Sequence, residues 1–191
     1  LEFLDKSLEA DPSNELALNC KGIVLTFLGK DQEALEFTDK LLEGDPDNAG
    51  ALVRKGSALL NLGKHQEALE CIDQLLEMDM DAENHAFILN NKGLVLTSFK
   101  KPQEALECFD KSLEMDISAD RRTCILNDKG SALFALGRYQ EALECFDKSL
   151  EMDISRGARL VQNILNAGSL YGKGSALFAL GRYQEALEAS E

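Results

Sequence analysis

An exact internal copy is the feature that most constrains the fold of this chain. The sixteen residues KGSALFALGRYQEALE occupy positions 129–144 and recur, letter for letter, at positions 173–188. An active site is normally built once, whereas a structural unit can be extended by copying. The duplication therefore predicts a repeat protein, in which each unit packs against its neighbours.

Two further markers extend the repeat over the whole chain. A Lys-Gly pair recurs five times, and a Gln-Glu-Ala-Leu-Glu segment follows each pair at the same offset. The glycines of these pairs are Gly22, Gly56, Gly93, Gly130 and Gly174, at steps of 34, 37, 37 and 44 residues. We expect one array over residues 1–191, with a partial repeat at 1–12, repeats at about 15–48, 49–82, 86–119 and 123–156, and an incomplete repeat at 167–191.

Each repeat has the pattern of two helices, named here helix A and helix B. In the fourth repeat, Leu126 and Leu133 belong to an apolar stripe with helical spacing, and Gly137 is placed to end helix A. Ala142 and Phe146, four residues apart, predict one buried face of helix B. An Asp-Pro pair ends helix B where it is present, because proline disfavours helix at the residue before it.

This pattern resembles the tetratricopeptide repeat. The matching residues are Gly22, Gly29, Ala34 and Pro46 in the first full repeat, Gly56, Gly63 and Ala68 in the second, Gly93, Ala105 and Phe109 in the third, Gly130, Gly137, Ala142 and Phe146 in the fourth, and Gly174, Gly181 and Ala186 in the fifth. The resemblance implies an all-α fold, an α-solenoid of antiparallel helix pairs forming a right-handed superhelix. It also implies that helices A line the concave face.

The sequence departs from the regular pattern in several ways: the period grows by three residues twice, later repeats lose the terminal proline, and leucine replaces the usual aromatic residue early in helix A. Two further departures are local. Lys100 stands where the other repeats have a turn glycine, and residues 155–165 carry an insertion. We expect the LVQNIL part of the insertion to lengthen helix A by up to about two turns, with SRGAR as the linker.

Charge and cysteine usage narrow the class of partner and compartment. The formal net charge of -14 argues against nucleic acid, whose phosphates require Lys and Arg, and it favours a neutral or basic protein partner. No apolar run reaches the roughly 18 residues of a membrane helix. The five cysteines are odd in number and form no CxxC pair, so we expect neither a disulfide framework nor a zinc site. Cysteines used in this way indicate a reducing compartment, and we expect a cytoplasmic protein. Cys71, Cys108 and Cys145 share one repeat position, where we expect small apolar side chains that are buried or half-buried.

The sequence contains no recognisable catalytic, cofactor or metal-binding motif. A recurring glutamate follows the start of each helix B, at Glu33, Glu67, Glu104, Glu141 and Glu185. A glutamate at that place suits the helix dipole and is typical of a solvated surface. His65 and His85 have no ligand spacing around them. We therefore expect a chain that is not an enzyme and that needs no cofactor or metal.

The candidate binding surface is the concave face. Positions three before, one after and four after the glycine of each Lys-Gly pair share one face of helix A, and the groove-lining positions of the resembled family match them. The predicted peptide-binding residues at these positions are Asn19, Ile23, Ser57, Asn90, Leu94, Asn127, Ser131, Phe134, Tyr171, Ser175 and Phe178. Asn91 is added to the set because it stands where some relatives in the resembled family more usually carry a peptide-holding asparagine. Their side chains are uncharged, and an asparagine amide can both donate to and accept from a peptide backbone.

Three functions are compatible with these residues. The first is a non-catalytic scaffold that binds a peptide or helix of a partner protein in the concave groove. The second is self-assembly by end-to-end stacking through uncapped ends. The third is the regulatory repeat region of a larger enzyme or signalling protein.

Overall fold

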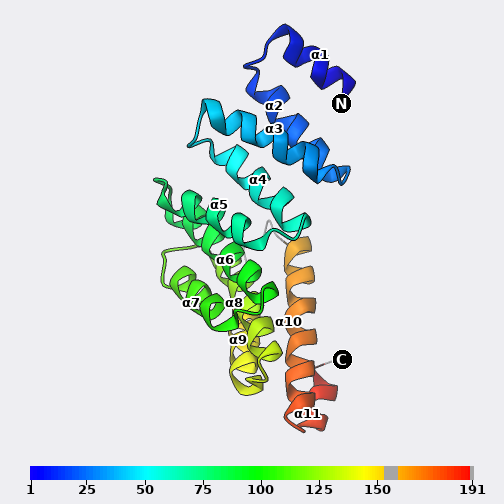
Figure 1. Ribbon diagram of the computed structural model, residues 1–191. Helices are drawn as coiled ribbons and strands as arrows, with labels where there is room; N and C mark the ends of the chain where they lie inside the picture. The colour runs from blue at the N-terminus through cyan, green and yellow to red at the C-terminus, as the bar shows by residue number, and fades with distance from the viewer. Residues whose placement is uncertain (153–158, 190–191) are drawn as a thin grey trace. The chain divides into compact units, whose positions relative to one another are not determined.

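The computed structural model describes residues 1–152 and 159–189, without the side chains of residues 15, 19 and 159–166. Throughout this part the regular secondary structure is helical and contains no strand (Figure 1). The chain divides into two compact units, Leu1–Asp79 and Met80–Glu191, and each is described by itself. The predicted all-α solenoid is confirmed, whereas the single array and its repeat limits stay predictions.

The first unit consists of α1 (Glu2–Ala10), α2 (Glu15–Phe27), α3 (Asp31–Gly44), α4 (Ala49–Asn61) and α5 (His65–Glu77). Helix α2 packs against α1, α3 and α4, and α4 packs against α3 and α5. In terms of the repeat, α2 and α4 are helices A, and α1, α3 and α5 are helices B.

The second unit consists of α6 (Ala82–Ser98), α7 (Pro102–Leu113), α8 (Ala119–Ala135), α9 (Tyr139–Glu151), α10 (Arg159–Ala179) and α11 (Tyr183–Glu188). Helix α8 packs against α6, α7, α9 and α10, and α10 also packs against α9 and α11. Neighbouring helices A therefore lie side by side, and each of α8 and α10 sits on both helices of the preceding pair.

The hairpin turns share one hydrogen-bonding motif. Helix A ends with a residue at positive φ, which is Gly137 (φ 74°) in the fourth repeat and Lys100 (φ 57°) in the third. The next N–H donates to a carbonyl five residues back, as from Arg138 to Leu133 at 3.0 Å. This motif satisfies carbonyls that the helix end leaves without partners. The turn needs the left-handed conformation, so glycine is the residue it favours.

Small residues allow helices A and B to approach closely. An added Cβ at Gly93 would lie 2.6 Å from the Phe109 ring, and one at Gly130 would lie 2.7 Å from the Phe146 ring. Both rings are fully buried or nearly so, and each lies close to the glycine of the facing helix. Glycine is therefore needed here for space. Cys71, Cys108 and Cys145 are buried, as predicted for that repeat position.

The added residues of the later repeats lengthen helix A. Helix α4 has 13 residues, α8 has 17 and α10 has 21. Helix α10 begins at Arg159, next to the LVQNIL segment that was expected to extend it. The SRGAR linker falls largely on residues 153–158, outside the described part.

The lysine before the glycine of the Lys-Gly pair has a structural role in four repeats. Its ammonium group pairs with an aspartate on the preceding helix B. The pairs are Lys21 with Asp5, Lys55 with Asp39, Lys129 with Asp110 and Lys173 with Asp147. Each pair connects consecutive repeats, although half-exposed pairs of this kind stabilise a fold only modestly.

No helix in the described ranges has the length and apolar character needed to cross a membrane.

Candidate peptide-binding surface

The predicted binding residues are divided between the two units. Asn19, Ile23 and Ser57 belong to the first unit, and the other nine belong to the second. Ile23 is exposed, and the Ser57 hydroxyl donates to the Val53 carbonyl at 2.9 Å, within its own helix. The side chain of Asn19 lies outside the described part. The second unit therefore contains most of the surface that can be analysed.

Asn90 is buried and engaged with the neighbouring helix A. Its amide Nδ2 donates to Oδ2 of Asp128 on α8 at 2.7 Å. Its Oδ1 is buried and accepts no hydrogen bond from the described part of the chain. Burial raises the pKa of the Asp128 carboxyl, and the hydrogen bond from Asn90 opposes that rise. The amide thus joins α6 to α8.

Asn127 makes a similar connection one repeat later. Its Oδ1 accepts a hydrogen bond from the Ser169 hydroxyl of α10 at 2.6 Å, and Ser169 lies 3.0 Å from the hydroxyl of Ser149 on α9. Ser131, one turn further along α8, donates to the Asn127 carbonyl at 2.9 Å. The polar side chains of Asn127 and Asn90 therefore hold helices A together, which is a use that the repeat pattern did not reveal.

The large exposed members of the predicted set are apolar or aromatic, and the small polar Ser131 is exposed as well. Leu94 on α6 and both Tyr171 and Phe178 on α10 are exposed, while Asn91 and Phe134 are half-buried. Large exposed apolar side chains that gather on one surface are typical of interaction sites.

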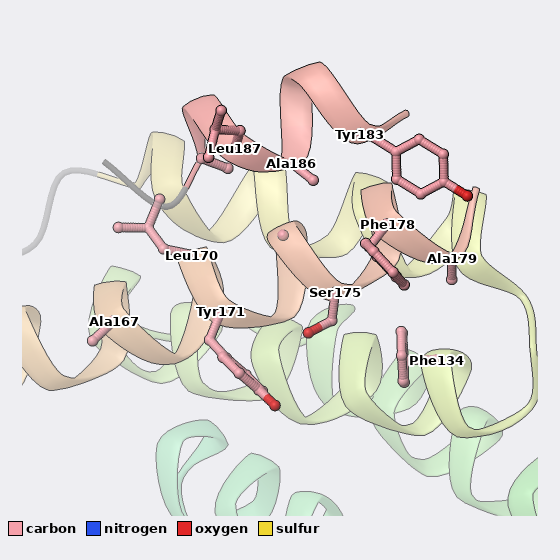
Figure 2. Close-up of a pocket in the computed structure, with 12 residues that line it drawn as sticks. Phe134, Ala167, Leu170, Tyr171, Ser175, Phe178, Ala179, Tyr183, Ala186 and Leu187 are labelled. Atoms are coloured by element: carbon pink, nitrogen blue, oxygen red, sulfur yellow. The ribbon is translucent and has the colours of Figure 1, made fainter. Parts of the chain in front are cut away.

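Four predicted residues line a pocket of about 1020 Å³ in the second unit: Phe134, Tyr171, Ser175 and Phe178. Figure 2 shows Tyr171, Ser175 and Phe178 leaving the same side of α10. The remaining walls are formed by further residues of α10 and by α11, which carries Ala186 and Leu187. Its lining contains no charged side chain, so it suits an apolar ligand surface.

Sequence analysis missed part of this pocket. Leu170 lies on α10, Tyr183 and Leu187 lie on α11, and all three are exposed. A signal for Tyr183 and Leu187 was present in the exact copy, because both belong to the second of the two identical segments.

Groups of acidic, histidine or cysteine residues that could hold a metal ion do not occur within the described ranges. The arrangement offers apolar surface and amide or hydroxyl groups, which is the chemistry of protein recognition.

Comparison with protein families matches the tetratricopeptide repeat at residues 47–118 and 121–191. No curated protein matches the sequence. Among solved structures, a putative kinesin light chain with nearly identical TPR-like repeats, from Podospora anserina, is 17% identical, with a TM-score of 0.72 and coverage of 93% of this chain and 92% of that chain.

Two further structures give the same fold. YrrB is described as a TPR protein with an unusual peptide-binding site; it is 22% identical, with a TM-score of 0.64 and coverage of 97% of this chain and 88% of that chain. PilF of Pseudomonas aeruginosa is 25% identical, with a TM-score of 0.65 and coverage of 98% of this chain and 87% of that chain.

Proposed function

Because the chain belongs to the tetratricopeptide repeat family, we propose that it is a non-catalytic interaction module that binds a peptide or helix of a partner protein on the surface of its helices A. The observation that carries this proposal is the exposure of large uncharged side chains on α6 and α10, namely Leu94, Tyr171 and Phe178. Burying such side chains against a partner is the main driving force of association.

The peptide-binding site described for the neighbour YrrB supports this kind of ligand. The chain's net charge of -14 favours a partner segment that is neutral or basic, because like charge would slow and weaken the encounter. The asparagines contribute less directly to peptide binding than their sequence positions suggest. Asn90 is already hydrogen-bonded to Asp128, and Asn127 to Ser169.

Peptide selection against the immobilised chain tests this function. We expect neutral or basic peptides that bind with a Kd on the order of micromolar, as for a small and partly hydrated interface. Leu94→Lys should weaken the selected peptides at least tenfold, because it places a charge among apolar contacts. Isothermal titration calorimetry measures the change.

Leu136 provides a matched control for Leu94. Leu94 is 39% exposed and Leu136 is 38% exposed, but Leu136 lies in the turn after α8. Leu136→Lys should leave peptide affinity unchanged. An equal loss of peptide affinity in the Leu94→Lys and Leu136→Lys variants would refute a binding site on helices A. If light scattering shows a mass that rises with concentration, end-to-end self-assembly is the better account of function.

A further inference from the structure

Asp128 carries a carboxylate that the fold leaves without a cation. Its Oδ2 accepts a hydrogen bond from Nδ2 of Asn90 at 2.7 Å, and its Oδ1 accepts none from the described part of the chain. Burial raises the pKa of this carboxyl, and no neighbouring cation acts against that rise. A carboxylate that is partly withdrawn from water costs free energy unless a positive charge compensates it.

The three cationic side chains of α8 are all engaged with groups other than Asp128. They are Arg121, which pairs with Glu83; Arg122, which donates to the carbonyl oxygens of Leu113 and Met115; and Lys129, which pairs with Asp110. On α10, which packs against α8, Lys173 pairs with Asp147. Asp128 forms no ion pair with a lysine or arginine of the described ranges. A cation for this carboxylate would therefore come from a bound molecule.

Asp128 belongs to the surface on which the predicted binding residues lie. It stands 37 residues after Asn91, at the same repeat position, and it remains partly accessible. Asn90, to which it is hydrogen-bonded, lies one helical turn before the exposed Leu94 on α6. Three residues after Asp128, the exposed Ser131 lies on the same face of α8. The carboxyl therefore lies beside the apolar surface of α6 that the proposed function uses.

This surface is open although helices surround it. Helix α8 packs against α6, α7, α9 and α10, and Asp128 is nevertheless partly accessible, so its accessibility is a property of the packed helices. Phe87, which is exposed, lies one turn before Asn91 and extends the apolar strip that Leu94 begins on α6. An unpaired negative charge beside exposed apolar side chains is complementary to a segment that combines a cation with apolar residues.

We infer that Asp128 selects a lysine or arginine side chain of the bound partner segment, whose apolar neighbours would cover Leu94 and Phe87. This inference rests on the proposed function and names the partner chemistry of the same surface. Ammonium and guanidinium groups supply both a positive charge and hydrogen-bond donors, and the Asp128 carboxylate lacks a partner of that kind. A partner protein meets this requirement better than a second copy, because each copy carries the same net charge of -14.

One random peptide library, selected in parallel against the wild-type chain and the Asp128→Asn variant, tests the inference. Peptides that bind the wild-type chain should share a lysine or arginine at one position, and those that bind the variant should not. Asp116→Asn is the matched control, since it removes the same charge at an exposed position between α7 and α8. This control variant should select the same basic peptides as the wild-type chain.

Neutral analogues of one selected peptide show whether its cation meets Asp128. Citrulline in place of arginine, or acetyl-lysine in place of lysine, removes the charge and keeps most of the side chain's shape. By isothermal titration calorimetry, the wild-type chain should bind the neutral peptide at least tenfold more weakly than the charged peptide. The Asp128→Asn variant should bind the two peptides with equal affinity. A purely structural effect of this substitution would weaken both peptides alike and leave the ratio of their affinities unchanged.

Two results overturn this inference and leave the proposed function standing, provided that Leu94→Lys still weakens peptide binding. The first is a set of wild-type binders that share no basic residue, and the second is an Asp128→Asn variant that keeps the tenfold preference for the charged peptide. If no peptide binds the wild-type chain, both proposals fail. If light scattering shows self-association that Asp128→Asn abolishes, the occupant is a second copy, and the inference of a partner segment is wrong.

Discussion

The side-chain amide of Asn90 on α6 donates to the carboxylate of Asp128 on α8, with Nδ2 and Oδ2 2.7 Å apart. The two residues are 38 positions apart in the sequence, and they meet because neighbouring helices A pack side by side. The pair leaves Oδ1 of Asn90 buried without a donor in the described part of the chain, while Asp128 has a raised pKa because of burial. Both features identify a contact that is not optimal at neutral pH.

Asp128→Asn should stabilise the second unit at neutral pH. An asparagine at this position keeps an acceptor for Nδ2 of Asn90 and adds a donor for its Oδ1, and it removes a buried charge. The expected gain in the free energy of unfolding is about 1 kcal/mol. Urea unfolding followed by circular dichroism measures it.

The gain should also depend on pH. The raised pKa means that the folded state holds a proton that the unfolded chain releases, so the carboxyl favours folding at acidic pH and loses that effect as pH rises through its folded pKa. The advantage of Asp128→Asn should therefore shrink at mildly acidic pH. Asp116→Asn, at an exposed position, is the control. If the gain in unfolding free energy from Asp128→Asn stays constant with pH, burial does not destabilise the carboxylate of Asp128.

Leu143→Ala and Leu187→Ala change the same residue in identical sixteen-residue segments. Leu143 is covered by Ala176 and Leu177, so its truncation should cost about 2–5 kcal/mol of unfolding free energy. Leu187 is exposed in the described structure, and its truncation should change stability by no more than about 0.5 kcal/mol. Thermal denaturation compares the two, and equal costs would show that α10 does not create the difference in environment.

Gly130→Ala and Gly174→Ala form a second matched pair in the same two segments. An alanine Cβ at 130 would meet the buried Phe146 ring at 2.7 Å, whereas the nearest atom to a Cβ at 174 is the Ala186 carbonyl oxygen at 3.8 Å. Gly130→Ala should destabilise by about 1–3 kcal/mol through overpacking. Gly174→Ala should stabilise by about 0.5–1 kcal/mol, because alanine favours helix.

The essential result for this pair is that the two variants change the free energy of unfolding in opposite directions. Chemical denaturation of both variants measures it. Stabilisation by Gly130→Ala would contradict the close approach of α8 to Phe146.

Lys100→Gly should stabilise the α6–α7 hairpin. Lys100 has φ 57°, in the left-handed region that the turn glycines occupy at φ 67° to 74°. Relief of this strain is offset in part by the greater freedom of glycine in the unfolded chain, which leaves a gain of about 0.5–1 kcal/mol. Lys111→Gly, inside α7, should instead lose about 1 kcal/mol. Urea midpoints of both variants test this, and destabilisation by Lys100→Gly would refute strain at the turn.

The fold was predictable because its signals are local. Gly137 and its equivalents end helix A through a turn that needs positive φ, and Asp45 follows α3 at an Asp-Pro pair. The lengthening of α10 was visible in the apolar pattern of the inserted LVQNIL. The candidate surface was predicted less completely, since helical spacing indicates the face on which Asn90 lies but says nothing about Asp128, its partner on another helix.

By itself, the sequence determined the helical repeat, the hairpin turns and the small residues at the crossings, because each depends on contacts within one pair of helices. Only the tertiary structure decided which copy of an identical segment is covered, since Leu143 and Leu187 differ in what packs against them and not in their own neighbours along the chain. It also decided that Asn127 bonds to Ser169 of the next helix A. Burial and polar pairing between repeats are properties of the packed stack, and for that reason they cannot be read from any one repeat.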